Sequence, residues 1–500
     1  MLGWLADLFR LAGGLLYWNI RKTWFRLRRG RSPCPCQSPS DSGRALETRC
    51  DACLQWHRPA RFRRVCPLLV QTKDGLRCSA NTPDVRPFWW RAAGYYGVAA
   101  GAVYLAGVLV VFSFLRGVGY PVSVIEVAAP PLWNHVTRAR GWYFFQRSQR
   151  AFVAGHPSEG LLYLANAYEL DPSNYQIGLV LAKNYQVSQP ARSDQIFGQL
   201  MRDHRDRRDD TAQDWFRALL ARGDFEKIVP LARDEMLADP AHAHAWIRAL
   251  LFATRHTGDN AALRALLARP EPAAVRWRPL LETELLVRAG RNAEAHAALV
   301  RPWPEDAPRF TAFYRANTLI ALGDTFAAVD IVGANAALDD ETREMLLLDA
   351  YAAAGAQAAR QREAVRLIGN ASAPEVTLLC AHLVRYPDRA LFQQLFDAFV
   401  RRKPPLDSDT AGVWFSLLCT AGAVGDDARL HTLASQLKQA SATPFLALGV
   451  VEAFFVDPAN QRRVTSVLPI LPLPLEVTYA LIERYSPASI RAPDPLSKSK

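Results

Sequence analysis

The sequence lacks the short patterns that identify several large enzyme classes. It contains no glycine-rich phosphate-binding loop, no HExxH metalloprotease helix and no nucleophile elbow. His242 and His244, in DPAHAHAW, occur at a predicted helix start. We interpret them as ordinary residues of that helix and not as metal ligands. The neighbouring carboxylates of 339–341 occur in a predicted turn, where exposure to solvent accounts for them. We therefore expect a protein that is not an enzyme.

Cysteine is scarce in most of the chain. Of 8 cysteines, only Cys380 and Cys419 follow residue 91. We interpret these two as buried helical cysteines in preference to a disulfide, which the sequence leaves open.

Charge is absent from Ala92 to Leu115, a run of 24 residues. As a helix rising about 1.5 Å per residue it spans roughly 36 Å, enough to cross a membrane once. The alternative is a buried core helix of a soluble protein, but such helices seldom run this long without a polar face. Trp and Tyr at 89–90 and 95–96 fall where an interfacial aromatic belt is expected.

The basic residues predict the orientation of this span. Residues 1–91 hold 17 Lys and Arg against 6 Asp and Glu, a net charge of +11, whereas the whole chain carries +12. By the positive-inside rule the N-terminus is cytoplasmic and the C-terminal part lies outside. Frequent Trp, Ala and Arg with few Lys suggest a high-GC bacterium, hence an inner-membrane protein with a periplasmic domain.

The first 31 residues resemble a segment that lies on a membrane surface. Residues 1–20 form an amphipathic helix pattern, and the basic stretch 21–31 follows it. A secretory signal carries its charges before the apolar run, so this is not one. Packing of the helix against its own domain and, less favourably, a second membrane span are the alternatives.

Six cysteines gather between residues 32 and 91, namely Cys34, Cys36, Cys50, Cys53, Cys66 and Cys78. In a cytoplasmic head these thiols stay reduced, so the cluster predicts a structural zinc site, since two close pairs complete tetrahedral coordination. Either Cys34, Cys36, Cys50 and Cys53 hold one ion, or Cys50, Cys53, Cys66 and Cys78 do; His57 is an alternative ligand. Iron–sulfur binding, thiol redox chemistry and unligated or disulfide-bonded cysteines are the competing interpretations.

Glycine marks a regular period in the tail. Gly155, Gly223, Gly258, Gly290, Gly323, Gly355 and Gly425 each follow an apolar helical stretch, separated by one or two units of about 34 residues. A helix, a glycine turn and a second helix in 34 residues resemble the tetratricopeptide repeat (TPR). One complete unit is formed by Phe144, Gly155, Gly160, Leu164, Ala167 and Pro172. The resemblance covers roughly nine degenerate units over about 141–440. It implies an all-α fold, with a right-handed α-solenoid over 141–455 whose concave face binds a protein partner.

Proline shapes the segments on either side of the solenoid. We expect an extended linker over 116–140, a Pro-rich extended segment and terminal cap over 456–485 that covers the last helix pair, and a disordered tail over 486–500.

Together these features predict a single-pass membrane scaffold or adaptor. Its TPR-like solenoid outside the cytoplasm would bind a partner protein, while the zinc-stabilised basic module engages an unspecified component inside; membrane lipids are a further expected partner of the protein. The first alternative gives the main activity to the basic module, binding anionic lipid or, less favourably, nucleic acid. The second is a thiol-redox membrane protein that uses Cys50 and Cys53.

Overall fold

The computed structural model describes two parts of the chain, Met1–Arg140 and Gly141–Lys500, as separate compact units. In the head it describes the backbone of 37–39, 46–48, 69–72 and 75–78. It then describes 85–239, 242–303, 308–402, 404–407, 409–440, 447–457 and 463–486, with side chains from Gly97 onward apart from a few positions. The predicted surface helix of 1–31 and the tail of 487–500 lie outside the described residues.

Two short antiparallel strand pairs belong to the head. Strand β1 (Gln37–Pro39) pairs with β2 (Leu46–Thr48), and β3 (Leu69–Thr72) pairs with β4 (Gly75–Cys78). Gln37 is opposite Thr48 in the first pair, and Leu69 is opposite Cys78 in the second. Each pair is therefore an antiparallel hairpin, and the start of its first strand lies beside the end of its second strand.

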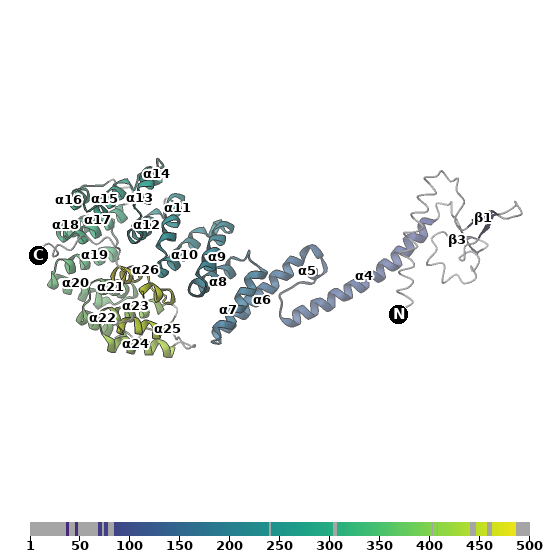
Figure 1. Ribbon diagram of the computed structural model, residues 1–500. Coiled ribbons are helices and arrows are strands. Elements are labelled where there is room, and N and C mark those ends of the chain that lie inside the picture. The colour runs from purple at the N-terminus through teal and green to yellow at the C-terminus, as the bar shows by residue number, and fades with distance from the viewer. Residues whose placement is uncertain are drawn as a thin grey trace. The chain divides into compact units, whose positions relative to one another are not determined.

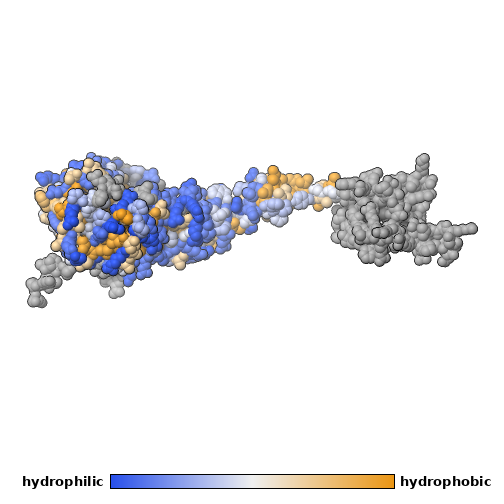
Figure 2. All heavy atoms as spheres, turned by 90° about the horizontal axis from the view of Figure 1, so that it is seen from above, coloured by the Kyte–Doolittle hydropathy of each residue, from blue (hydrophilic) through white to orange (hydrophobic). Residues whose placement is uncertain are grey.

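Helix α4 (Val85–Val118) contains the one stretch, among the described residues, that is long and apolar enough to cross a membrane, Gly97–Val118. Its apolar side chains are largely exposed; Val98, Val103 and Phe114 are 74%, 74% and 68% accessible. Figure 2 shows hydrophobic residues along the described part of this helix, against a mainly hydrophilic surface on the helical array. By its length and composition, this helix is able to cross a membrane.

Helical turns replace the extended linker that we expected over 116–140. Helix α5 (Val124–Ala128) starts at a capping box between Ser123 and Glu126, and the 3₁₀ helix η1 (Pro130–Leu132) follows it. Pro130 and Pro131 are the first two residues of η1, where a backbone N–H would have no partner within the helix. The prolines are therefore compatible with the start of a helix here. The turns fold back on α4, since the Tyr104 hydroxyl donates to the Ala128 carbonyl oxygen.

All regular elements described between Val85 and Ser486 are helices, which confirms the predicted all-α class for this part of the chain. From α6 onward they pair as consecutive hairpins (Figure 1). The hairpins are α6 (Trp133–Val153) with α7 (Pro157–Leu170), α8 (Tyr175–Ser188) with α9 (Pro190–Asp203), α10 (Arg208–Arg222) with α11 (Phe225–Ala238), α12 (Ala243–Thr257) with α13 (Asn260–Leu267), α15 (Arg278–Arg288) with α16 (Asn292–Val300), α17 (Pro308–Leu322) with α18 (Thr325–Ala334), α19 (Asp340–Ala353) with α20 (Gln357–Asn370), α21 (Ala373–Arg385) with α22 (Arg389–Arg401), and α23 (Ala411–Ala423) with α24 (Asp427–Ala440). The short elements η2 (Arg205–Arg207) and α14 (Pro272–Val275) lie between hairpins.

The seven glycines that mark the sequence period all occupy hairpin turns. Their φ angles lie between 69° and 90°, in the left-handed region that L side chains rarely adopt. The α8/α9 turn instead uses Gln189 before Pro190, and the α21/α22 turn uses Asp388, whose side chain caps α22. The period read from the sequence is thus the period of the turns.

The last described helices do not continue the hairpin series. After α25 (Ala447–Val456) the chain forms two 3₁₀ turns, η3 (Val464–Ser466) and η4 (Leu468–Ile470), and then α26 (Leu475–Tyr485). This segment forms helical turns where we expected an extended strip, and it reaches beyond the last helix pair. Pro472 and Pro474 lie against Gly412 of α23, in the last hairpin, whereas Thr465 lies against Gly223, in the α10/α11 turn. Figure 1 shows α26 among α19, α21 and α23. Pro474 is the N-cap of α26, so here too proline begins a helix.

Candidate partner-binding site

The predicted zinc ligands lie almost wholly outside the described residues. Cys34, Cys36, Cys50, Cys53 and Cys66 are not described, and only the backbone of Cys78, the last residue of β4, is.

Cys380 and Cys419 are buried free thiols, which confirms the preferred interpretation over a disulfide. Burial disfavours the thiolate and raises the pKa of Cys380 to about 12, so neither thiol is suited to redox chemistry.

A cavity of about 1050 Å³ opens on the inner face of the array. Its walls come from the first helices of successive hairpins, α10, α12, α17, α19, α21 and α23, together with α26. Because hairpin follows hairpin, residues far apart in sequence, such as Gln213 and Asp409, face one space. The cavity is therefore the candidate for the partner-binding surface that the sequence predicts.

Aromatic side chains form the floor of this cavity. Trp246 and Trp277 are 5% and 1% exposed, and they pack edge-on against Phe216 and Phe310, with ring centroids 5.8 Å apart in both pairs. The Trp277 indole N–H is buried and has no hydrogen-bond acceptor among the described residues. The floor is therefore rigid and apolar, with one unsatisfied donor.

The cavity walls carry opposite charges. On the α10–α12 side Arg217 and His242 are exposed, with Arg248 half-buried beside them. On the α19–α23 side the exposed charges are Glu341 and Asp409. A ligand that bridges the walls would place its acidic groups toward α10 and α12 and its basic groups toward α19 and α23.

Helix α26 already occupies part of the inner face through Tyr479. The tyrosine ring is 4% exposed; it meets Phe252 of α12 edge-on, with centroids 4.6 Å apart, and the Arg248 guanidinium lies 4.6 Å from its centroid. Val477, Ala480 and Ile482 of α26 are fully buried as well. Thr478 and Leu481 are buried too, so the middle of α26 is enclosed on every side and belongs to the hydrophobic core of the array.

Polar contacts anchor the C-terminal end of α26 to later hairpins. Arg484 donates to the carbonyl oxygens of Val384 at 2.8 Å and Ala423 at 2.9 Å, which lie near the ends of α21 and α23. Glu483 pairs with Arg385 of α21 at 2.9 Å. Since Tyr479 contacts α12, this one helix joins hairpins separated by more than 100 residues in the sequence.

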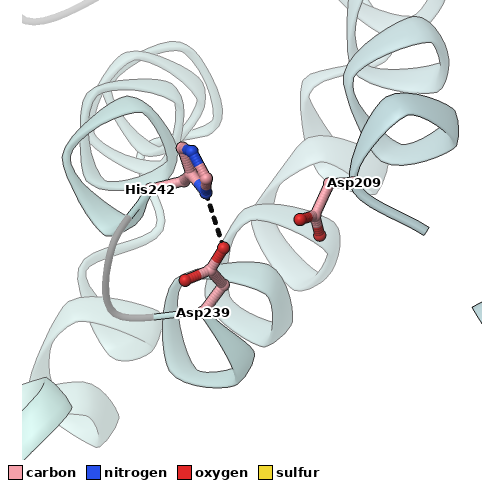
Figure 3. A group of neighbouring side chains, drawn as sticks. All are labelled: Asp209, Asp239 and His242. Atoms are coloured by element: carbon pink, nitrogen blue, oxygen red, sulfur yellow. Dashed lines mark hydrogen bonds and ion pairs between the residues drawn. The ribbon is translucent and has the colours of Figure 1, made fainter. Parts of the chain in front are cut away.

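Asp209, Asp239 and His242 are the described residues that come nearest to a metal site. They lie at the start of α10, the end of α11 and the start of α12, and one ligand atom of each lies within 4.8 Å of the others (Figure 3). His242 Nδ1 is 2.6 Å from Asp239 Oδ2, and this hydrogen bond raises the pKa of His242. Asp209 and His242 are exposed and Asp239 is half-buried, and exposed acidic groups of this kind are common without a bound metal.

A buried charge cluster stiffens the hairpins that form the cavity. Glu284 of α15 is fully buried; it accepts hydrogen bonds from Arg255 of α12 at 2.6 and 2.7 Å, from Arg288 at 2.9 Å and from the Tyr314 hydroxyl of α17 at 2.9 Å. The two guanidinium groups hold the pKa of Glu284 at about 2 against the cost of burial. Three consecutive first helices are thereby tied together.

Comparison with protein-family models, with curated proteins and with solved structures finds no match for this chain.

Sequence reasoning missed two parts of this site. It placed Pro-rich 456–485 over the last helix pair and so did not bring Tyr479 or Glu476 to the cavity. It also did not join His242 to Asp209 and Asp239. The signal for the second was present, because the repeat places the end of each second helix beside the start of the next first helix.

Proposed function

We propose that this protein is a single-pass membrane adaptor whose helical array binds a segment of a partner protein on its inner face, a binding role without catalysis. The observation that supports this most is the 1050 Å³ cavity with an aromatic floor and oppositely charged walls. Pockets of this size that combine an apolar floor with a few polar groups are typical of binding sites.

The array is best interpreted as a degenerate, right-handed TPR-like solenoid. The turn glycines at a spacing of about 34 residues and the consecutive hairpins support this proposal. Solenoids of this kind present extended concave surfaces, which fits a partner that enters as a peptide or helix.

The charge distribution supports a cytoplasmic head and an array outside the cytoplasm. Residues 1–91 carry a net +11, and Arg138 is the first basic residue after Arg116. Reporter fusions after Arg86 and after Trp142 should report cytoplasm and outside, respectively. The reverse pattern would contradict this orientation.

A zinc ion held by cysteines is proposed to stabilise the head. The register of β1 and β2 supports the set Cys34, Cys36, Cys50 and Cys53, because Gln37 and Thr48 are cross-strand partners and the two cysteine pairs precede and follow them in the sequence. Metal analysis of the purified chain should find zinc that is lost in a Cys50→Ser, Cys53→Ser variant.

A second candidate function is that the head binds anionic lipid or nucleic acid as the main activity of the protein. The net charge of +11 on residues 1–91 favours this candidate, and salt-sensitive binding to either ligand would support it.

Charge reversal inside the cavity tests the adaptor role. Arg217 is exposed there and makes no ion pair with any described residue, so Arg217→Glu should leave the fold intact. Proteins that co-purify with the wild-type chain from its native membranes should be lost from this variant. Arg264→Glu, on the second helix α13, is the matched control, because Arg264 is also exposed and makes no ion pair with any described residue; this variant should retain them. Equal recovery with both variants would count against binding in the cavity.

A further inference from the structure

The segment that follows α4 packs back against the C-terminal half of that helix. Buried side chains join α4 to the turn after it, to α5 and to the start of α6; they are Val108, Val122, Val127 and Ala139. The Tyr104 hydroxyl, within the stretch Gly97–Val118, donates to the carbonyl oxygen of Ala128, the last residue of α5. The chain therefore reverses after Val118 and runs beside the stretch that is able to cross a membrane.

The contact with Tyr104 lies far from the end of α4. The helix between Tyr104 and Val118 is roughly 21 Å long at about 1.5 Å per residue, and the hydrocarbon core of a bilayer is about 30 Å thick. If α4 crosses a membrane and Val118 lies near the boundary, the end of α5 lies inside the hydrocarbon core beside it.

The returning segment has the composition of a chain that enters lipid. Residues 117–134 contain one charged side chain, Glu126. The Glu126 carboxylate accepts a hydrogen bond from the Ser123 backbone N–H at 2.7 Å, so it is turned toward the N-terminal end of α5. Because the chain descends from Val118 to Ala128, that end is the shallower one, where a carboxylate costs least.

Apolar side chains of this segment point away from the described protein. Ile125 is 70% exposed and Trp133 is 57% exposed, much as Val110 on the surface of α4 is 70% exposed. The Trp133 indole N–H donates to the Val127 carbonyl oxygen at 3.2 Å, so this ring has its polar group satisfied without water. Both side chains are therefore suited to an apolar surrounding.

The backbone of the segment is largely paired within the protein. The Tyr120 N–H donates to the Leu115 carbonyl oxygen, and the Ala129 N–H donates to the Ile125 carbonyl oxygen, both at 2.9 Å. The three prolines of the segment have no N–H to satisfy, and the capping box closes the start of α5. This pairing matters because lipid acyl chains offer no hydrogen bonds to a polypeptide.

We infer that residues 119–133 form a re-entrant segment, which enters the bilayer beside α4 and contacts lipid acyl chains through Ile125 and Trp133. The inference rests on the membrane span in the proposed function and adds a second contact with lipid. The segment enters and leaves on one side of the bilayer, so it adds no further crossing. Its contact with Tyr104, inside Gly97–Val118, favours lipid over a partner protein as the surrounding of these side chains.

Photo-crosslinking of the full-length chain in liposomes of phosphatidylethanolamine and phosphatidylglycerol tests this inference. p-Benzoylphenylalanine in place of Ile125 should form acyl-chain adducts, detected by peptide mass spectrometry, as frequently as the same residue in place of Val110. The same result is expected at Trp133, where one aromatic side chain replaces another. The matched control is Phe326 of α18, an apolar residue that is 79% exposed, where lipid adducts should be absent.

Three results would overturn the inference. Lipid adducts at Val110 but not at Ile125 and Trp133 would leave the span intact and exclude re-entry. Adducts at Ile125 and Trp133 that are confined to lipid headgroups would place the segment on the membrane surface. A lack of adducts at Val110, Ile125 and Trp133 alike would refute the span as well, whereas the co-purification with Arg217→Glu tests partner binding separately.

Discussion

Replacing Glu284 by glutamine should destabilise the array by about 3 to 5 kcal/mol. The carboxylate is fully buried and accepts hydrogen bonds from Arg255, Arg288 and Tyr314, all between 2.6 and 2.9 Å. Glutamine keeps the shape but removes the negative charge, which leaves two guanidinium groups, one of them 2% exposed, without compensation. The expected loss is that of a buried ion pair broken on one side.

Urea unfolding of the full-length chain in detergent, followed by circular dichroism at pH 7, measures this loss. The matched control is Glu294→Gln, because Glu294 pairs with Arg291 at a site where both side chains are more than half exposed. Its expected cost is about 0 to 1 kcal/mol. A cost below about 1 kcal/mol for Glu284→Gln would refute the assignment of Glu284 as the charged centre of this cluster.

Three further predictions concern acid stability, the turn glycines and the buried thiols. The pKa of Glu284 is about 2 in the folded chain, against an ordinary value of 4.5. Its contribution to the free energy of unfolding is therefore complete above about pH 4.5 and disappears as the pH falls toward 2. Between pH 6 and pH 2 the wild type should lose about 3 kcal/mol more stability than Glu284→Gln, and parallel curves of stability against pH for the two proteins would contradict this. Gly223→Ala should destabilise the array more than Gly258→Ala. Both glycines have positive φ, but a Cβ at Gly223 would lie 2.7 Å from Thr465 Cγ2, whereas no atom lies within 4 Å of a Cβ at Gly258. Thr465→Ser should remove the difference between the urea midpoints of the two alanine variants, and equal midpoints without that change would show that η3 does not pack against the α10/α11 turn. Peptide mass spectrometry after maleimide treatment at pH 8 should find Cys380 and Cys419 modified only in urea, because both are buried and the pKa of each is raised; rapid labelling of the folded chain would disprove their burial.

The parts of the fold that the sequence predicts well are those set by local chemistry. Glycine is the residue that tolerates a left-handed turn, so the period of Gly223, Gly258 and Gly290 reveals the hairpins directly. The uncharged run before Arg116 likewise reveals α4, because 24 residues without a charge are long enough to form a helix that can cross a membrane.

The parts that it misses depend on long-range contacts or on proline in a favourable position. His256 approaches the Ser486 carbonyl oxygen across 230 residues, and no local pattern specifies that pairing. Pro130 and Pro474 resemble helix breakers in sequence, yet each stands at a helix start. The candidate site therefore becomes visible only when α26 is placed inside the array.

The most direct test of partner binding on the inner face is site-specific photo-crosslinking in native membranes. A crosslinker at Gln213, exposed in the cavity, should yield one discrete adduct with another protein, whereas a crosslinker at Gln357, exposed at the start of the second helix α20, should not. The same adduct from both positions, or an adduct from Gln357 alone, would contradict the account.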